Sequence, residues 1–182
     1  MPNPANPEAS ARALREQFPI LDEGLYLNHA AVGPWPRCAA EAVRAFAAEN
    51  LNHGPARYAV WIERTDELRD GLARLTGAAS AADIALLKNT TEGISAVAWG
   101  LDWRAGDNLV LPHSEFPSNR LPWLAQRSRG VEVREVDIRS AADAEAALIG
   151  AMDSRTRLLS VSAVQWSDGF RLDLQRLGDA CH

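Results

Sequence analysis

The chain has 182 residues and a mass of 19.8 kDa, with 47% hydrophobic and 24% charged residues, which is typical of a folded globular protein. The net charge of −5 argues against nucleic-acid binding through phosphate neutralisation. No apolar run approaches the ~18 residues that span a bilayer, and the N-terminus lacks a secretory signal. Two cysteines and four scattered histidines show neither a disulfide framework nor a metal-ligand spacing, so we expect a cytoplasmic protein without a metal site.

The first 80 residues have a helical pattern. Residues 1–17 comprise a proline-rich, flexible arm and a short helix over 11–17 that stops before Pro19. Residues 18–80 form a lead-in segment, with an extended apolar piece at 24–27 and two further helices. Apolar spacing predicts these helices over 37–50 and 58–75, the second ending at Gly77.

From residue 81 the pattern changes to strands that alternate with helices. Short apolar runs typical of buried strands occur at 84–87, 108–112, 131–136 and 157–164. Helical segments follow them at 90–101, 117–129, 141–152 and 172–181. This alternation predicts an α/β fold with a mainly parallel sheet over 81–182. No strand follows the last helix, although a helix in such a fold normally leads into the next strand, so we expect the sheet to be incomplete at the C-terminus.

The segment Asn89–Gly93 is the strongest local signal for a ligand site. It joins a predicted strand to a helix at the edge where open α/β sheets bind ligands. Asn89 and Glu92 resemble a capping box, and the free N–H groups of the helix start favour a phosphate. The hydroxyls of Thr90 and Thr91 add donors. The alternative is a well-capped helix without a ligand.

Two further segments end at the same predicted edge. Phe116 follows the strand at 108–112, and its ring is suited either to stacking on a flat ligand or to core packing. Gln165 and Trp166 follow the strand at 157–164 and either face the same cleft or form an ordinary turn. Asn28 and His29 lie in the turn-rich segment 28–34, where an Asx turn with a surface histidine is the alternative to a functional role.

These segments, in this order and spacing, resemble the class V aminotransferase family of pyridoxal-phosphate (PLP) enzymes. That family includes cysteine desulfurases and isopenicillin N epimerase-like proteins. The resemblance covers residues 18–182 and rests on Tyr26–Gly33, Asn89–Ile94, Ser114–Asn119, Pro122–Trp123, Val161–Trp166 and Gly169–Leu174.

The resemblance implies the three-layer α/β/α large domain of fold-type-I PLP transferases. Thr90 and Thr91 match the positions that hold the cofactor's phosphate. Phe116 matches the position whose ring stacks on the pyridine, where desulfurases usually carry histidine. Ala163 stands where many members place Asn or His near the cofactor's phenolic oxygen, and Gln165 is the nearby candidate to replace that contact.

The resemblance also implies an enzyme, normally a homodimer, that acts on an amino-acid substrate by transamination, β-elimination (desulfuration) or epimerisation. Asn28 and His29 match the segment that approaches the substrate. The family's pyridine-pairing aspartate and Schiff-base lysine lie beyond the last helix, so we expect this chain to lack both and to be inactive alone. Lys88, the one lysine among 19 basic residues, adjoins the phosphate turn and not the aldehyde side of the ring. We therefore assign no catalytic residue.

Two other interpretations stay open at this point. In the first interpretation, the chain is a non-catalytic truncated remnant or interaction module that needs a complementary C-terminal half, because an incomplete sheet exposes an apolar edge. In the second, the chain is an α/β protein that binds a nucleotide or sugar phosphate at the Thr90–Thr91 turn. Thermal-shift comparison of PLP with nucleotides separates this last class from the first.

Overall fold

The computed structural model describes residues 7–29 and 31–182. The chain divides into two compact units whose boundary lies between Ala85 and Leu86. Each unit is described by itself below. Within the described residues, no helix is both long enough and apolar enough to cross a membrane.

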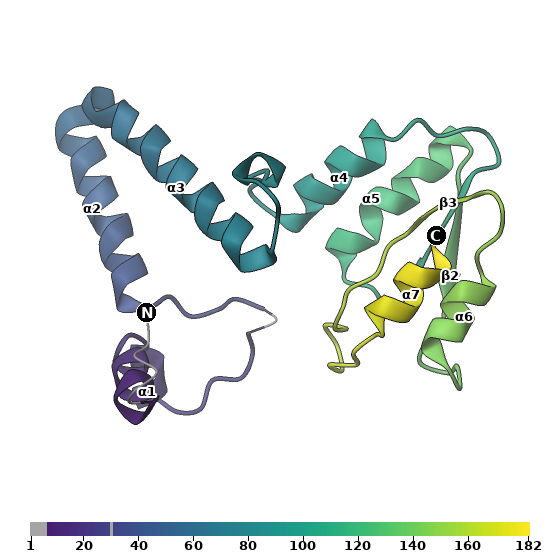
Figure 1. Cartoon of the computed structure of the whole chain (residues 1–182), viewed down its shortest axis with the longest axis horizontal. Coiled ribbons are helices and arrows are strands. Elements are labelled where there is room, and N and C mark those ends of the chain that lie inside the picture. Colours follow the sequence, from purple (N-terminus) through teal and green to yellow (C-terminus); the bar gives the residue numbers. More distant parts are fainter. Residues whose placement is uncertain (1–6, 30) are drawn as a thin grey trace. The chain divides into compact units, whose positions relative to one another are not determined.

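The first unit contains the three predicted helices. They are α1 (Pro7–Glu16), α2 (Arg37–His53) and α3 (Tyr58–Thr76), with short 3-10 turns η1 (Pro19–Asp22), η2 (Gly54–Arg57) and η3 (Ala81–Asp83) (Figure 1). The predicted stop at Gly77 is confirmed, because this residue adopts a left-handed conformation (φ 74°). The segment 24–27 belongs to no helix or strand.

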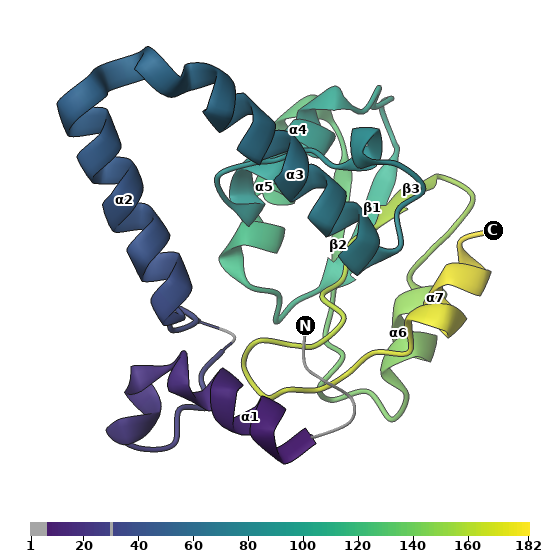
Figure 2. The ribbon, with the colours of Figure 1, turned by 60° about the vertical axis from the view of Figure 1, so that its left-hand side comes forward.

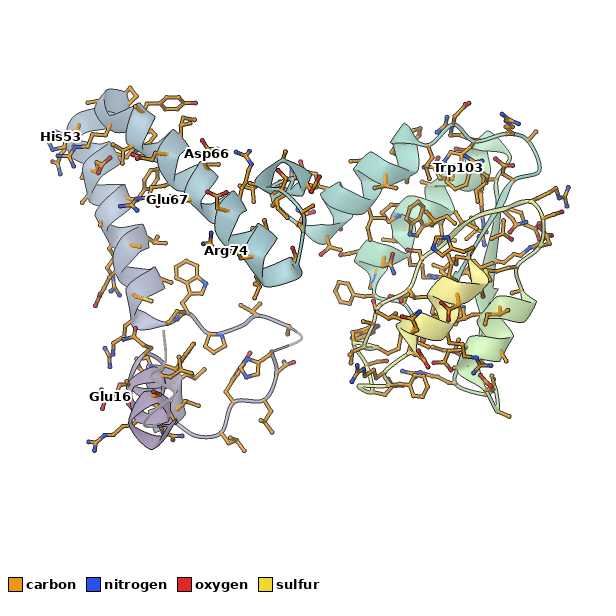
Figure 3. All side chains as sticks on the ribbon, viewed as in Figure 1. Glu16, His53, Asp66, Glu67, Arg74 and Trp103 are labelled. Carbon is orange, nitrogen blue, oxygen red and sulfur yellow. The ribbon has the colours of Figure 1, made fainter. Side chains whose placement is uncertain are left out.

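Aromatic side chains join α2 to α3. The Trp61 ring lies edge-on to that of Phe46, with 5.2 Å between centroids, and its indole N–H donates to Glu49 over 2.9 Å. Few other apolar groups are covered: Ala73 is the one buried hydrophobic residue among those described in this unit. Figure 3 labels three charged side chains of α3, Asp66, Glu67 and Arg74.

The second unit contains a three-stranded parallel sheet. Its strands are β1 (Asn108–Pro112), β2 (Glu132–Val136) and β3 (Thr156–Leu159), in the order β2-β1-β3. Asn108 pairs with Glu132 and with Thr156, and both pairings are parallel. The helices are α4 (Thr90–Gly100), α5 (Leu121–Leu124), α6 (Ala144–Gly150) and α7 (Leu174–Ala180), while η4 (Pro117–Asn119) and η5 (Ala125–Arg129) flank α5 (Figure 2).

Alternate residues of β1 build the two faces of the core. Leu109 and Leu111 pack with residues of α4, α5 and β2, among them the fully buried Ala98 and the buried Trp123. Val110 points to the opposite cluster, which α6 and α7 cover. Trp103 is partly buried and packs against the first cluster, and its indole N–H donates to the carbonyl of Ala98 over 2.8 Å (Figure 3). The predicted α/β/α arrangement with a parallel sheet is therefore confirmed.

Two strand predictions need correction. Residues 84–87 form no strand, since the segment pairs with neither open edge of the sheet, β2 or β3. It packs on α4 instead: a Cβ placed on Gly93 would lie 3.2 Å from Leu87 Cδ1. The strand expected over 157–164 ends at Leu159, and Val164 makes only an isolated antiparallel bridge with Arg171. An apolar run alone does not distinguish a strand from such a segment.

The helix expected over 117–129 is divided into η4, α5 and η5. Pro122 accounts for the break between η4 and α5, since it lacks an N–H and is accepted in the first turn of α5. The other helices are confirmed with shifted ends: α6 and α7 begin at Ala144 and Leu174, after the N-caps Asp143 and Asp173.

Candidate functional site

The turn before α4 has the capped geometry that the sequence predicts. Asn89 Oδ1 accepts a hydrogen bond from the Glu92 N–H over 2.9 Å. The Glu92 carboxylate reaches back to the N–H of Lys88 over 2.8 Å, one residue earlier than in the standard capping box. Among the described residues, none accepts a hydrogen bond from the N–H of Thr90 or Thr91. Two free donors at the positive end of α4 are therefore available for an anion.

The turn before α4 contacts the segment that follows β1. Thr91 Oγ1 donates to Ser118 Oγ over 3.1 Å, and both hydroxyls lie at the carboxyl edge of the sheet. Behind them, Asn119 is buried and accepts from Ser160 Oγ (2.6 Å) and from the Trp123 indole (3.1 Å). These bonds link the N-terminus of α4, the turn after β1 and the end of β3.

Phe116 lies beside Trp166, as their common edge predicts. The ring centroids are 5.5 Å apart at an interplanar angle of 81°, an edge-to-face contact. The side chains are 47% and 53% exposed, so neither ring is part of the core. Core packing, the alternative for Phe116, is thus wrong, and its ring is free to cover a flat ligand.

Gln165 is 2% exposed and belongs to a hydrogen-bonded network. Its Nε2 donates to Glu115 Oε1 (3.3 Å) and to the Ser162 carbonyl (3.4 Å), while its Oε1 accepts from Ser114 Oγ (3.4 Å). One side of Gln165 lines a cavity of about 360 Å³ together with Ile138, Arg139, Ala141, Ala142, Ala144, Asp168 and Phe170. Contact between Gln165 and a cofactor stays a prediction.

Glu135, near the end of β2, pairs with basic side chains from neighbouring segments. Glu135 accepts from Arg120 (2.5 Å) and Arg127 (3.2 Å), and His113 lies 3.7 Å away. Burial acts to raise the pKa of the Glu135 carboxyl, but the Arg120 bond and the neighbouring positive charges outweigh it, so the pKa is lowered. A phosphate at the α4 turn would therefore rely on N–H and O–H donors more than on these arginines.

Three predicted residues remain: Lys88 in the second unit, and Asn28 and His29 in the first. Lys88 is exposed, and its Nζ is 3.8 Å from Glu92 Oε1. Asn28 and His29 are exposed residues of the first unit, where the His29 ring lies 5.3 Å from that of Tyr26 and the Tyr26 hydroxyl donates to the Asn28 carbonyl. Their role toward a substrate stays a prediction.

Sequence reasoning missed Glu115, Ser118 and Ser162. A signal was present for each, because all three directly follow or lie near the carboxyl ends of parallel strands, where polar side chains meet.

The fold and this edge define an α/β protein with two unpaired N–H groups at a helix start and an adjacent exposed ring. Residues 25–182 match the family Aminotransferase class-V, and the chain belongs to that family. The resemblance seen in the sequence is thereby confirmed.

The chain is also similar to individual proteins whose names describe reactions of sulfur amino acids. The chain is 34% identical over 173 residues to a probable cysteine desulfurase of Methanothermobacter thermautotrophicus, covering 93% of this chain and 43% of the relative. Among solved structures, the cystine C–S lyase C-DES in complex with cysteine persulfide matches with a TM-score of 0.83 and 30% identity, covering 91% of this chain and 45% of that one. A C-DES variant with glycine covalently linked to the PLP cofactor matches with a TM-score of 0.82 and 30% identity, covering 92% and 45%. The chain thus spans less than half the length of the relatives it matches.

Proposed function

We propose that this chain binds PLP at the carboxyl edge of its sheet and contributes to an enzyme that acts on an amino acid. One observation carries the proposal: two unsatisfied N–H groups and a threonine hydroxyl meet an exposed aromatic ring at one edge of a parallel sheet. The family membership and the PLP in the C-DES structure support it.

The residues present fit the phosphate and the flat ring of PLP. The N–H groups of Thr90 and Thr91 and the Thr91 hydroxyl would hold the phosphate at the positive end of α4. Phe116 would cover one face of the pyridine ring. Gln165, held by its bond to Glu115, would supply the polar contact to the cofactor that Ala163 does not make.

When bound, PLP supplies an electron sink for bonds broken at the substrate amino acid. The relatives' names favour a sulfur amino acid and a β-elimination or desulfuration reaction. Asn28 and His29 would approach that substrate. Lys88 takes no part in our proposal, because it is paired with Glu92 at the phosphate end. The Schiff-base lysine would come from outside this sequence.

A partner polypeptide is the second part of the proposal. Both β2 and β3 have one neighbouring strand each, so two sheet edges are open among the described residues. Val164, Phe170 and Leu174 are large apolar side chains exposed beyond β3. A homodimer or a complementary C-terminal half would cover them. A chain without such a partner is the non-catalytic alternative.

Equilibrium dialysis of the 182-residue chain against PLP and pyridoxal tests the proposed function. We expect PLP to bind saturably and pyridoxal to bind at least about tenfold more weakly, because pyridoxal lacks the phosphate. Thr91→Val should weaken PLP about tenfold and leave pyridoxal unchanged, whereas Thr65→Val on α3 should change neither. Equal affinity for both ligands would show that the α4 turn is no phosphate site. Stronger binding of a nucleotide than of PLP would favour an α/β protein that binds a nucleotide or sugar phosphate at the Thr90–Thr91 turn.

A further inference from the structure

Glu115 is a buried carboxylate without a basic partner. It is 4% exposed, and none of the ion pairs among the described residues includes it. Three donors satisfy it instead: the Ser162 N–H at 2.6 Å, the Ser162 hydroxyl at 2.8 Å and Gln165 Nε2 at 3.3 Å. Burying an acid without a cation is costly, so these three hydrogen bonds must offset the loss of its hydration.

The bonds to Glu115 begin where the β-ladder ends. The last backbone hydrogen bond between β1 and β3 runs from the Ser160 N–H to the Val110 carbonyl over 2.9 Å. Beyond it, no backbone–backbone bond joins residues 113–116 to residues 161–166 within the described chain. Side chains replace the ladder here, and Glu115 makes three of the bonds that cross.

The residues on either side of Glu115 contact the same facing segment. The Trp166 indole N–H donates to the Ser114 carbonyl over 3.0 Å, and the Phe116 ring meets the Trp166 ring at 5.5 Å. Three consecutive residues are thus attached to residues 162–166, with the buried carboxylate at the centre. The Phe116 ring has no other aromatic neighbour among the described residues, so its position depends on this attachment.

We propose that Glu115 is a positioning residue, which holds the turn of Phe116 against the segment of Gln165 and Trp166 and so fixes the plane on which the cofactor ring rests. This inference depends on the proposed PLP site for its ligand, but the attachment itself is a property of the free chain. Glutamine has the shape to keep it. Its carbonyl oxygen accepts from the Ser162 N–H and from Gln165, and its amide donates to the Ser162 hydroxyl, whereas alanine loses all three bonds.

The test compares Glu115→Ala and Glu115→Gln with Glu132→Ala, a control on β2 that removes an exposed carboxylate bound to Arg134. The chains carry 5-fluorotryptophan, and the ¹⁹F resonance of Trp166 is assigned by its loss in Trp166→Phe. Without cofactor, we expect the Trp166 resonance to move in Glu115→Ala and to stay in place in Glu115→Gln and Glu132→Ala. PLP affinity by dialysis should fall about tenfold in Glu115→Ala and less than about threefold in the other two.

An unchanged Trp166 resonance and unchanged PLP affinity in Glu115→Ala would overturn the proposal, as would a glutamine variant as weak as the alanine one. If Glu115→Ala does not fold by circular dichroism, Ser162→Ala removes one of the three bonds, and a shifted Trp166 resonance is expected there too. If the unsubstituted chain binds no PLP while the resonance still responds to Glu115→Ala, the proposed function fails and the attachment stands.

Discussion

Replacing Asn89 with aspartate separates helix capping from phosphate binding. Asn89 Oδ1 accepts from the Glu92 N–H at 2.9 Å, and a carboxylate oxygen accepts the same bond. Aspartate at an N-cap is as good as asparagine, and its charge gains about 0.3–1 kcal/mol from the helix dipole. The stability of the second unit should therefore stay constant or rise slightly.

The same charge should weaken an anion at the free N–H groups of Thr90 and Thr91. Two unit charges about 4 Å apart repel each other by roughly 1 kcal/mol in water, and a phosphate carries between one and two charges. The expected loss is therefore ~1–2 kcal/mol, or about tenfold in the dissociation constant of PLP. Because the turn is exposed, the loss should shrink as salt is raised from about 0.05 to 0.5 M.

Urea unfolding and equilibrium dialysis measure the two effects on one preparation of Asn89→Asp. The control Ser154→Asp adds the same charge to an exposed residue before β3, at the amino edge of the sheet, and should leave PLP affinity unchanged. The reasoning is refuted if Asn89→Asp binds PLP as tightly as the unsubstituted chain, or if Ser154→Asp weakens it equally.

Three further predictions concern Lys88, the loss of stability at low pH and the packing of the core. Borohydride reduction of the chain with PLP, followed by peptide mapping, should give no specific adduct at Lys88, because its ammonium is held 3.8 Å from Glu92; a saturable adduct there would contradict this. Hydrogen bonds from Asn108 and the Arg155 N–H, and then from Arg134, lower the pKa of Asp153 from 3.8 to about 2, so its contribution to stability is present above about pH 4 and is lost toward pH 2. Asp153→Asn should accordingly flatten the loss of stability between these pH values in urea titrations, and an unchanged slope would refute the assignment. Leu111→Ala, at a fully buried position of β1, should destabilise the second unit by about 2–5 kcal/mol in urea unfolding, whereas Leu121→Ala, at an exposed position, should cost far less; equal losses would show that the core is placed wrongly.

The sequence predicts those elements whose signals are local. The strand over 108–112 and the helix start at Asn89 were both placed correctly, because an apolar run between turn residues and an Asn-x-x-Glu cap need no distant partner. The strand prediction for residues 84–87 is wrong, because a strand must also pair with a neighbour, and pairing is not visible in a short apolar run.

The candidate site follows the same division. Thr90, Thr91 and Phe116 lie at the expected edge, since parallel strands bring their carboxyl ends together. The link from Thr91 to Ser118 and the bonds of Glu115 to Ser162 span 27 and 47 residues, and only the folded chain shows them. The burial of Gln165 was hidden for the same reason, because it depends on the partner that its amide finds.

The most direct test of the central claim is a ¹H–¹⁵N NMR titration of the chain with PLP, inorganic phosphate and pyridoxal. The claim is that the N–H groups of Thr90 and Thr91 hold the phosphate of PLP. We predict that these two amide resonances move with PLP and with inorganic phosphate, and move little with pyridoxal. If they stay in place with PLP, or respond equally to pyridoxal, the turn before α4 does not hold the phosphate and the proposed function is wrong.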